Sequence, residues 1–360
     1  MSHRLKKWRR NSACEEEPKR EPALSKRFRS RVPKTTLKRA LVVVAGLLLL
    51  SACTGPKAEE KPAAGAAPET IQPSGPLRVA VISHGTAGDA FWNVVKNGAE
   101  EAGRQLDVQV EYNSDGDPGN QAKLIDNAVA QRVGGLVVSM ANPEALKTSI
   151  ENAVRAGIPV ITINSGEDKS AAYGALTHVG QNETIAGEEA GKKFRELGKK
   201  KLLCVVHEAG NVGQAQRCDG AKTGFAGDVQ TLQVDISNPT DAESRIRGAV
   251  QTDSSLDAVL TLNSQVAARA VSAIKAVGST AQVGTFDLNT DVVGAIKSGD
   301  VVFAVDQQQY EQGYLPVQFL KLYRDNANVV GGGKPVLTGP DLVDKSTVDT
   351  VGRYVQRGTR

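Results

Sequence analysis

Residues 77–112 read LRVAVISHGTAGDAFWNVVKNGAEEAGRQLDVQVEY, and this stretch decides the fold class. The run LRVAVI at its start has the length and composition of a buried strand. Apolar residues then recur with helical spacing over 90–106, and a second strand-like run follows at 107–112. A strand, a helix and another strand in this order are typical of a parallel βαβ unit.

The same alternation continues along the chain. Short runs rich in Val, Ile and Leu predict further strands at 135–140, 158–163, 202–206, 231–236, 256–262 and 281–286. Helical spacing predicts helices at 119–132, 143–156, 185–197, 215–225, 242–251 and 266–277. Near-continuous apolar strands separated by helices indicate parallel sheets that are covered on both faces. We therefore predict an α/β, doubly wound fold, and the roughly 280 residues from Leu77 onward favour two lobes.

Polar side chains follow the predicted strands at their carboxyl ends, which is where ligands bind in sheets of this kind. Small hydrogen-bonding groups suit a polyhydroxylated ligand, because each hydroxyl needs a directed donor or acceptor. A second interpretation is that these Asn and Asp residues simply cap the helices that follow. The polar residues at the strand ends are Ser83, His84, Asp89, Asn142, Asn164, Ser165, Asn263, Asp287, Asp306 and Gln307.

Phe91 and Trp92 form an adjacent aromatic pair in a chain with 4% aromatic residues, so capping alone does not account for this segment. The apolar face of a sugar ring needs a flat apolar partner, and an aromatic side chain provides one. Helical neighbours point apart, so we expect one of the two rings to belong to the core.

A secretion signal is predicted before this body. Residues 40–52, ALVVVAGLLLLSA, carry no charge but are too short for a bilayer span, which needs about 20 apolar residues. The run ends in Leu50-Ser51-Ala52-Cys53, which resembles the bacterial lipobox, where the cysteine thiol takes a lipid. We expect cleavage to remove residues 1–52 and a lipid on Cys53 to anchor the protein to the outside of the cell membrane. The alternative is a plain signal peptide followed by an incidental cysteine.

Composition separates the signal, a linker and the body. Residues 1–39 contain 14 Lys and Arg against 4 Glu, a net charge of +10. Because the whole chain has a net charge of +4, residues 40–360 carry a net charge of −6. An acidic body is a poor binder of nucleic acid, because neutralising phosphates requires clustered cations. Residues 53–76 are rich in Pro, Ala, Gly and Glu without apolar periodicity, which predicts a flexible linker.

Two cysteines, Cys204 and Cys218, remain in the predicted body. Outside the cytoplasm an even pair favours a disulfide. Cys204 lies in the predicted strand at 202–206 and Cys218 in the helix that follows it, and a strand packs face to face with such a helix. We expect a Cys204–Cys218 bridge, with two buried free thiols as the alternative.

Several stretches of the body resemble the periplasmic sugar-binding proteins of ABC importers, in the ribose- and galactose-binding group. They are GDAFWNVVKNGAEEA, GGLVVSMANPEAL, AGIPVITINS, HVGQNETIAGEEAG, CVVHEAGNVGQAQRCDGAKTGF, LTLNSQVAARAVSAIKAVG and VGTFDLNTDVVGAIKSGDVVFAVDQQQYEQGY, in this order. The resemblance implies a periplasmic binding protein type I architecture, with two parallel-sheet lobes joined by a three-strand hinge. The lobes would comprise residues 77–180 plus about 307–335, and residues 181–306 plus about 336–360.

The resemblance also implies a ligand site. Asp89, Phe91 and Trp92 match the polar and double-aromatic motif that grips the sugar. Asn164 and Ser165 stand where ribose binders carry an Asp-Arg pair, and the loss of those charge-assisted hydrogen bonds argues against ribose. The remaining positions that the resemblance assigns to the site are Gln181, Arg217, Asn263, Asp287 and Asp306.

The function implied is capture of a monosaccharide or polyol between the lobes, hinge closure, and delivery to an ABC permease. We expect a monomer without cofactor or metal. An enzyme is disfavoured, because the sequence has no G-x-S-x-G, H-E-x-x-H or phosphate-binding GK[ST] motif. A lac-repressor-like regulator would need DNA-binding helices where this chain has a signal and linker. A lipoprotein that presents a sugar-like signal to a membrane receptor remains an alternative.

Overall fold

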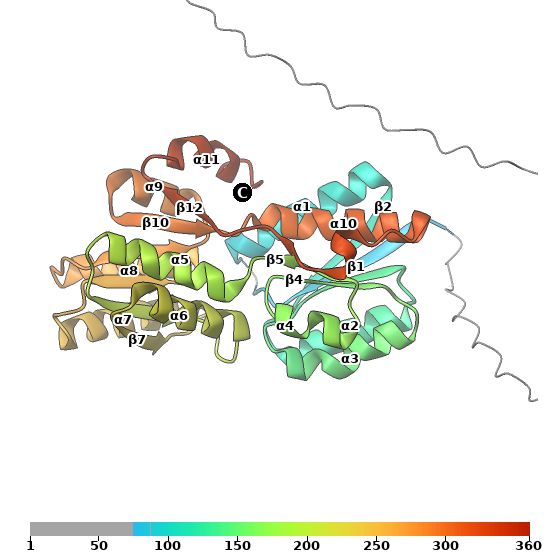
Figure 1. Ribbon diagram of the computed structural model, residues 1–360, viewed down its shortest axis with the longest axis horizontal. Helices are drawn as coiled ribbons and strands as arrows, with labels where there is room; N and C mark the ends of the chain where they lie inside the picture. The colour runs from blue at the N-terminus through green and yellow to red at the C-terminus, as the bar shows by residue number, and fades with distance from the viewer. Residues whose placement is uncertain (1–74, 87) are drawn as a thin grey trace, which may run out of the picture. The chain divides into compact units, whose positions relative to one another are not determined.

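The computed structural model describes residues 75–86 and 88–360 (Figure 1). The predicted signal segment 1–52, the predicted lipidation site Cys53 and nearly all of the predicted linker 53–76 lie outside the described residues. Among the helices that are described, none combines the length and the apolar character that a membrane span requires.

The first lobe is built on a six-stranded sheet in the order β11-β5-β4-β3-β1-β2, in which every pair is parallel. Its strands are β1 (Leu77–Ser83), β2 (Val108–Ser114), β3 (Gly135–Ser139), β4 (Val160–Ile163), β5 (Thr177–Gly180) and β11 (Val336–Leu337). Its helices are α1 (Ala90–Leu106), α2 (Pro118–Ala130), α3 (Pro143–Arg155), α4 (Glu167–Ser170) and α10 (Gln309–Asn326). Helices α1 and α10 cover one face of this sheet, and α2 and α3 cover the other (Figure 1).

The second lobe repeats this plan with the sheet order β12-β10-β9-β8-β6-β7. Its strands are β6 (Lys201–Val206), β7 (Asp228–Gln233), β8 (Ala258–Thr261), β9 (Gln282–Phe286), β10 (Val301–Asp306) and β12 (Asp341–Asp344). Its helices are α5 (Glu183–Glu196), α6 (Val212–Phe225), α7 (Pro239–Thr252), α8 (Ser264–Ala276), α9 (Thr290–Ser298) and α11 (Val348–Val355). The edge strand β12 runs antiparallel to β10, and the other pairs are parallel. The predicted two-lobed α/β fold is confirmed.

Three chain segments connect the two sheets, at residues 181–182, 307–308 and 338–340. Thr338 ties them together, because its backbone N–H donates to Gly180 O at 2.8 Å and its hydroxyl donates to Gln307 O at 2.7 Å. Strand β11 still belongs to the first sheet, so the third connection begins slightly later than residue 336, where the second lobe is predicted to resume.

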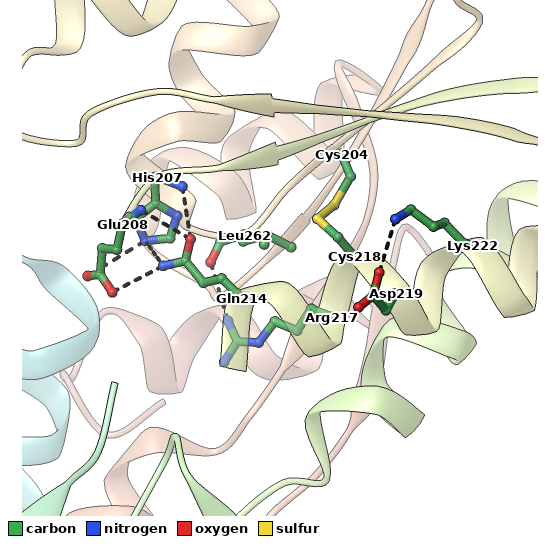
Figure 2. Close-up of a disulfide and its surroundings, with 9 residues drawn as sticks. All are labelled: Cys204, His207, Glu208, Gln214, Arg217, Cys218, Asp219, Lys222 and Leu262. Atoms are coloured by element: carbon green, nitrogen blue, oxygen red, sulfur yellow. Dashed lines mark hydrogen bonds and ion pairs between the residues drawn. A yellow bond between two sulfur atoms is a disulfide. The ribbon is translucent and has the colours of Figure 1, made fainter. Parts of the chain in front are cut away.

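The disulfide between Cys204 and Cys218 is formed, which confirms the predicted bridge. It joins β6 to α6 with a Cα–Cα distance of 5.9 Å (Figure 2). Both cysteines lie in an apolar cluster with Phe194 and Phe225. The bridge therefore fixes the helix α6 on its sheet, and Arg217 is the residue that directly precedes Cys218 on this helix.

Helices α5 and α6 pack unusually close together because glycines line their contact. A Cβ added at Gly224 would lie 1.9 Å from Glu188 O, and one added at Gly187 would lie 2.1 Å from Arg217 O. Any larger side chain at either position would push the helices apart, because the obstructing atoms are backbone. This close approach places Arg217 of α6 beside the first turn of α5.

Candidate functional site

A small cavity of about 30 Å³ lies between the lobes, where the carboxyl ends of the two sheets face one another. The residues that line it are His84, Asp89, Phe91, Trp92, Asn164, His207, Glu208, Asn211, Gln214, Arg217, Leu262, Asn263, Asp287 and Gln307.

Most of the site residues predicted from the sequence come together at this cavity. The predicted positions that line it are Asp89, Phe91, Trp92, Asn164, Arg217, Asn263 and Asp287. Ser165, Gln181 and Asp306 are also buried, but they are not among its lining residues. Ser165 hydrogen-bonds to Asn164 and Asn211, and Gln181 donates to Glu183.

Asp306 lies at the hinge rather than at the cavity. It is fully buried, and its carboxylate accepts hydrogen bonds from the Arg360 guanidinium and from the backbone N–H of Gln308. Successive residues of an extended segment point to opposite sides, so the next residue, Gln307, is the one that reaches the cavity.

Sequence reasoning missed several residues that also line the cavity. His207 and Glu208 directly follow β6, so the same rule that selected the other strand ends would have found them. Asn211 is the N-cap of α6 and Gln214 lies in its first turn, so both residues reach the cavity from the start of this helix.

Asp89 and the aromatic pair form the wall contributed by the first lobe. Asp89 is the N-cap of α1 and accepts a 2.8 Å hydrogen bond from the Phe91 N–H. Burial raises its pKa to about 6, although this amide partner opposes the shift. The Trp92 ring packs edge-on against Phe91 at 4.9 Å and against His84 at 4.7 Å between centroids. Capping and cavity lining are therefore performed by the same Asp89 side chain.

Arg217 projects into the cavity from α6 and is held by Glu183 at the start of α5. Its Nε donates to Oε2 at 2.6 Å and its Nη2 donates to Oε1 at 2.8 Å. Burial alone would lower the pKa of Arg217, but the Glu183 carboxylate reverses this and the pKa lies above its ordinary value. The guanidinium also stacks on the Phe286 ring, 4.6 Å from its centroid. Arg217 is thus a fixed cation with a defined orientation.

Gln307 connects both lobes at the back of the cavity. Its Nε2 donates to Asp287 Oδ1 at 2.6 Å, and its Oε1 accepts from Arg217 Nη2 at 3.0 Å and from Asn164 Nδ2 at 3.3 Å. Burial raises the pKa of Asp287 to about 8, even though Arg217 and Gln307 act in the opposite direction. This network aligns side chains from three separate strand ends.

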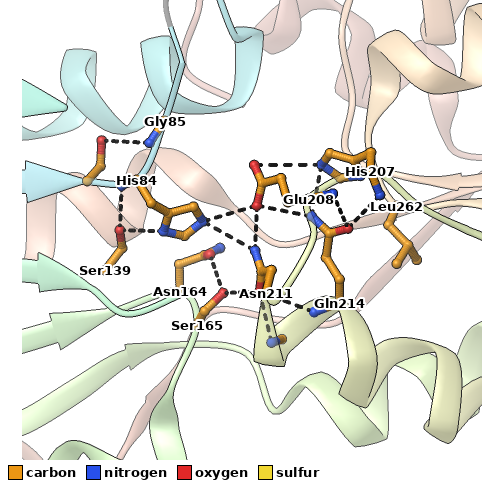
Figure 3. Close-up of polar contacts among 12 residues, drawn as sticks. His84, Gly85, Ser139, Asn164, Ser165, His207, Glu208, Asn211, Gln214 and Leu262 are labelled. Carbon is orange, nitrogen blue, oxygen red and sulfur yellow. Dashed lines mark hydrogen bonds and ion pairs between the residues drawn. The ribbon is translucent and has the colours of Figure 1, made fainter. Parts of the chain in front are cut away.

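His84 and Glu208 meet across the cavity mouth, with His84 on the first lobe and Glu208 on the second (Figure 3). His84 Nε2 lies 3.6 Å from Glu208 Oε2, and its Nδ1 lies 2.7 Å from Ser139 Oγ. Burial lowers the pKa of His84, with Glu208 opposing the shift. Asn211 donates to Glu208 at 2.5 Å and Gln214 donates to it at 3.1 Å, which holds this carboxylate in place.

A second, wider cavity of about 500 Å³ lies on the outer side of this contact. His84, His207, Glu208 and Asn211 line both cavities, so these four residues form the wall between them. Figure 3 shows the polar contacts that close this wall. A ligand in the inner cavity is therefore shielded from the outer one when the lobes have this arrangement.

The family model described as "Periplasmic binding protein domain" matches residues 79–327. A ribose import binding protein from Haemophilus influenzae is 27% identical over 241 residues, which cover 64% of this chain and 80% of that protein. The corresponding protein from Bacillus subtilis is 27% identical over 237 residues, covering 63% and 75%.

Solved structures show the same relationship. A carbohydrate transporter from Acidothermus cellulolyticus, determined in complex with myo-inositol, is 40% identical with a TM-score of 0.78, covering 79% of this chain and 100% of that one. A periplasmic sugar-binding protein from Legionella pneumophila has a TM-score of 0.67 at 23% identity, covering 73% and 99%, which shows the shared fold.

Proposed function

This chain belongs to the periplasmic binding protein family as a sugar-binding component of ABC transport, and from that premise we propose its specific role. It is a lipid-anchored protein that captures one small monosaccharide or polyol in the inner cavity and delivers it unchanged to a permease. The observation that supports this best is the cavity itself. It combines two aromatic rings with carboxylate, amide and guanidinium groups from both lobes.

In this proposal the residues of the first lobe and those of the second lobe contact different parts of the ligand. Trp92 packs against the apolar face of the ligand ring, while Asp89 and Asn164 accept and donate hydrogen bonds from the first lobe. From the second lobe, Arg217, Asn263 and Asp287 bind the remaining hydroxyls. Ser165, Gln181 and Asp306 support the site from outside the cavity rather than by direct contact.

A cyclitol is the first ligand to test. The structure from Acidothermus cellulolyticus contains myo-inositol and is 40% identical to this chain. Asn164 and Ser165 differ from the Asp-Arg pair of the ribose binders, which disfavours ribose. A cyclitol presents hydroxyls all round its ring, and this suits the polar groups that converge here from both sheets.

Ligand binding and lobe closure are one event in this scheme. The lobes already contact one another through Asn164 and Gln307, and His84 and Glu208. A ligand that touches both lobes stabilises this closed arrangement by its differential affinity for it. The closed protein then presents the surface that the permease recognises.

Cys53 anchors the mature protein in this proposal, and residues 53–76 act as a tether. A flexible linker of this length spans on the order of 25–30 Å. That reach allows the two lobes to approach a permease in the same membrane without releasing the anchor.

A thermal-shift screen of the purified chain against pentoses, hexoses, deoxysugars and inositols tests the function. A ligand at 100 times its Kd stabilises the folded protein by about 2.7 kcal/mol, which is readily observed. We expect one cyclitol or monosaccharide to raise the melting temperature and to be recovered chemically unchanged. A chemically altered compound, or no shift with any of them, would refute the proposal.

A further inference from the structure

Three carboxylates line the inner cavity, those of Asp89, Glu208 and Asp287, and Arg217 is the cationic side chain among the lining residues. Arg217 is already engaged, because Glu183 holds it through two hydrogen bonds. The positive charge of Arg217 is therefore balanced by the negative charge of Glu183, which is also buried. The cavity is therefore lined by more carboxyl groups than cationic side chains.

Asp89 and Asp287 are two of these carboxyl groups, and they come from opposite lobes. They are 4% and 3% exposed, and within residues 75–86 and 88–360 neither forms an ion pair. Asp89 is held by amide N–H groups at the start of α1, and Asp287 by the neutral amide of Gln307. Each carboxyl thus accepts these hydrogen bonds from neutral donors, and Arg217 acts on Asp287 without forming an ion pair, so keeping both groups ionised in this buried site costs free energy.

The neighbouring histidines do not supply the missing charge. Burial lowers the pKa of His84, and burial lowers the pKa of His207 to about 4. Both imidazoles are therefore neutral near pH 7. Glu208 differs from the two aspartates, because its pKa is lowered rather than raised, with His84, His207 and Arg217 and the hydrogen bond from Asn211 outweighing burial.

A neutral polyol would satisfy the hydrogen bonds of Asp89 and Asp287, but it would not stabilise their ionised forms. A ligand ammonium supplies both, since it donates up to three hydrogen bonds and carries the opposite charge. The Trp92 ring beside Asp89 adds a further attraction, because a cation is stabilised over an aromatic face. Among the described residues no three His, Cys, Asp or Glu side chains converge as metal ligands, so an organic cation fits this arrangement better than a metal ion.

We infer that the physiological ligand is a hydroxylated ring that bears a protonated amine, with the ammonium bound between Asp89 and Asp287. This inference rests on the proposed function and narrows its ligand class from any polyol to an amino-cyclitol or amino sugar. The electrostatics agree with it: burial raises the pKa of Asp89 to about 6 and of Asp287 to about 8, and a nearby cation would return both toward their ordinary values.

Calorimetry with matched ligand pairs tests this inference on the purified full chain. The pairs are myo-inositol with its amino-deoxy derivatives, glucose with glucosamine, and galactose with galactosamine, with the N-acetyl derivatives as uncharged controls. At pH 7 we expect the amine of at least one pair to bind at least tenfold more tightly than its neutral twin. Calcium chloride serves as the inorganic-cation control and should not compete with that amine.

The variant Asp287→Asn checks that this preference has the stated origin. It preserves the shape of the side chain, and its folding can be verified by thermal unfolding. We expect the preference for the amine to fall below threefold, while the affinity for the neutral twin changes less. When the wild-type protein is titrated in buffers of different ionisation enthalpy, the protein should take up fewer protons on binding the amine than on binding its neutral twin. Asp287→Asn should abolish that difference.

The outcomes separate this inference from the function beneath it. If neutral members bind as tightly as their amines in every pair, or if calcium displaces the amine, the inference is wrong and the proposed function stands. If no member of any pair binds, both fail. A preference that Asp287→Asn leaves unchanged would also overturn the assignment of the ammonium to this position.

Discussion

Arg217 and Glu183 form a buried two-point ion pair although they lie 34 residues apart, with an Nε–Oε2 distance of 2.6 Å and an Nη2–Oε1 distance of 2.8 Å. The pair lies between the first turn of α5 and the middle of α6, where the glycine-lined contact brings the two helices together. Its geometry holds the guanidinium toward the cavity. Glu183 thereby connects helix packing to the orientation of a proposed ligand-binding side chain.

The first prediction concerns this pair. Glu183→Ala leaves a buried guanidinium without its counter-charge, so we expect a loss of about 3–5 kcal/mol in unfolding free energy and weaker ligand binding. Glu183→Gln should recover part of the binding, because its amide oxygen still accepts a hydrogen bond. Chemical denaturation and calorimetry measure the two effects. The control Glu196→Ala removes an exposed carboxylate from the same helix, and equal losses in both alanine variants would contradict the role of Glu183.

The second prediction concerns the bridge between Cys204 and Cys218, which closes a sequence separation of 14 residues. Chain-entropy arguments assign about 3 kcal/mol of stability to a loop of this size. The double variant Cys204→Ser, Cys218→Ser should therefore have a lower melting temperature and weaker ligand binding, because α6 carries Arg217. Wild-type protein treated with reductant provides the comparison. Two reactive thiols in the unfolded, unreduced wild type would show that the bridge does not form in the protein.

The third prediction concerns the aromatic wall. Trp92→Ala removes the flat surface against which a ligand ring would pack, so we expect at least a tenfold loss of affinity. Trp92→Phe should lose less, because it retains an aromatic face. Asp287→Ala should likewise weaken binding at least tenfold by removing a hydrogen-bond acceptor. Calorimetry with the ligand from the screen measures all three, and unchanged affinity in Trp92→Ala and Asp287→Ala together would remove the proposed site.

The fourth prediction concerns acid stability. Burial lowers the pKa of His178 to about 4 and that of His207 to about 4, whereas an unfolded imidazole has its ordinary value of 6.5. Between these values the unfolded chain binds protons at these two imidazoles that the folded protein does not, so the stability that the imidazoles contribute is lost as the pH decreases from 6.5 toward 4, while the raised pKa values of Asp89 and Asp287 act in the opposite direction. Each imidazole contributes up to about 3 kcal/mol to this loss.

Denaturant titrations at pH 7.0 and 4.5 measure the loss, and His178→Gln supplies the matched comparison. His178 lies in the first lobe and hydrogen-bonds to Thr162 with a separation of 2.9 Å. The stability advantage of the wild type over the variant should be larger at pH 7.0 than at pH 4.5, because the variant lacks one of the imidazoles whose pKa is lowered by burial. An advantage that is the same at both pH values, or that grows toward acid, would contradict the prediction.

The fifth prediction concerns the anchor. Cys53→Ser removes the thiol that the lipobox would modify, so the protein should move from the membrane fraction to the soluble extracytoplasmic fraction. Ligand affinity should stay the same, because the site lies beyond residue 83. Cell fractionation with immunodetection measures the distribution. Retention of Cys53→Ser in the membrane fraction would show that another segment anchors the chain.

Much of the fold could be predicted because its determinants are local. Apolar runs separated by amphipathic helices indicated two doubly wound parallel sheets, and the helix caps at Asp89, Asn142 and Asn263 follow from residues adjacent in sequence. The Cys204–Cys218 bridge was likewise predictable, since a strand and the helix after it pack against each other. The segment after residue 334 contains the strands β11 and β12 and the helix α11.

The composition of the site was less accessible to sequence reasoning. The position of polar residues at strand ends predicted Asp89, Asn164, Asp287 and Gln307, which all line one cavity, whereas the family resemblance assigned Asp306 to the site and its neighbour Gln307 is the residue that reaches the space. It could not identify Glu183, because the pairing with Arg217 depends on how closely two helices approach. Glu208 lies at a strand end that the rule covers, yet its contact with His84 depends on the position of the opposite lobe.

Sequence alone was sufficient for the family, the two-lobed α/β architecture, the disulfide and most of the polar groups that meet between the lobes, because periodicity and strand-end position are properties of neighbouring residues. The charge balance of the cavity came from the three-dimensional arrangement. That Glu183 forms an ion pair with Arg217, while Asp89 and Asp287 form none among the described residues, depends on distances between side chains far apart in the chain. Those distances are set by helix packing and lobe contact, which local sequence patterns do not encode.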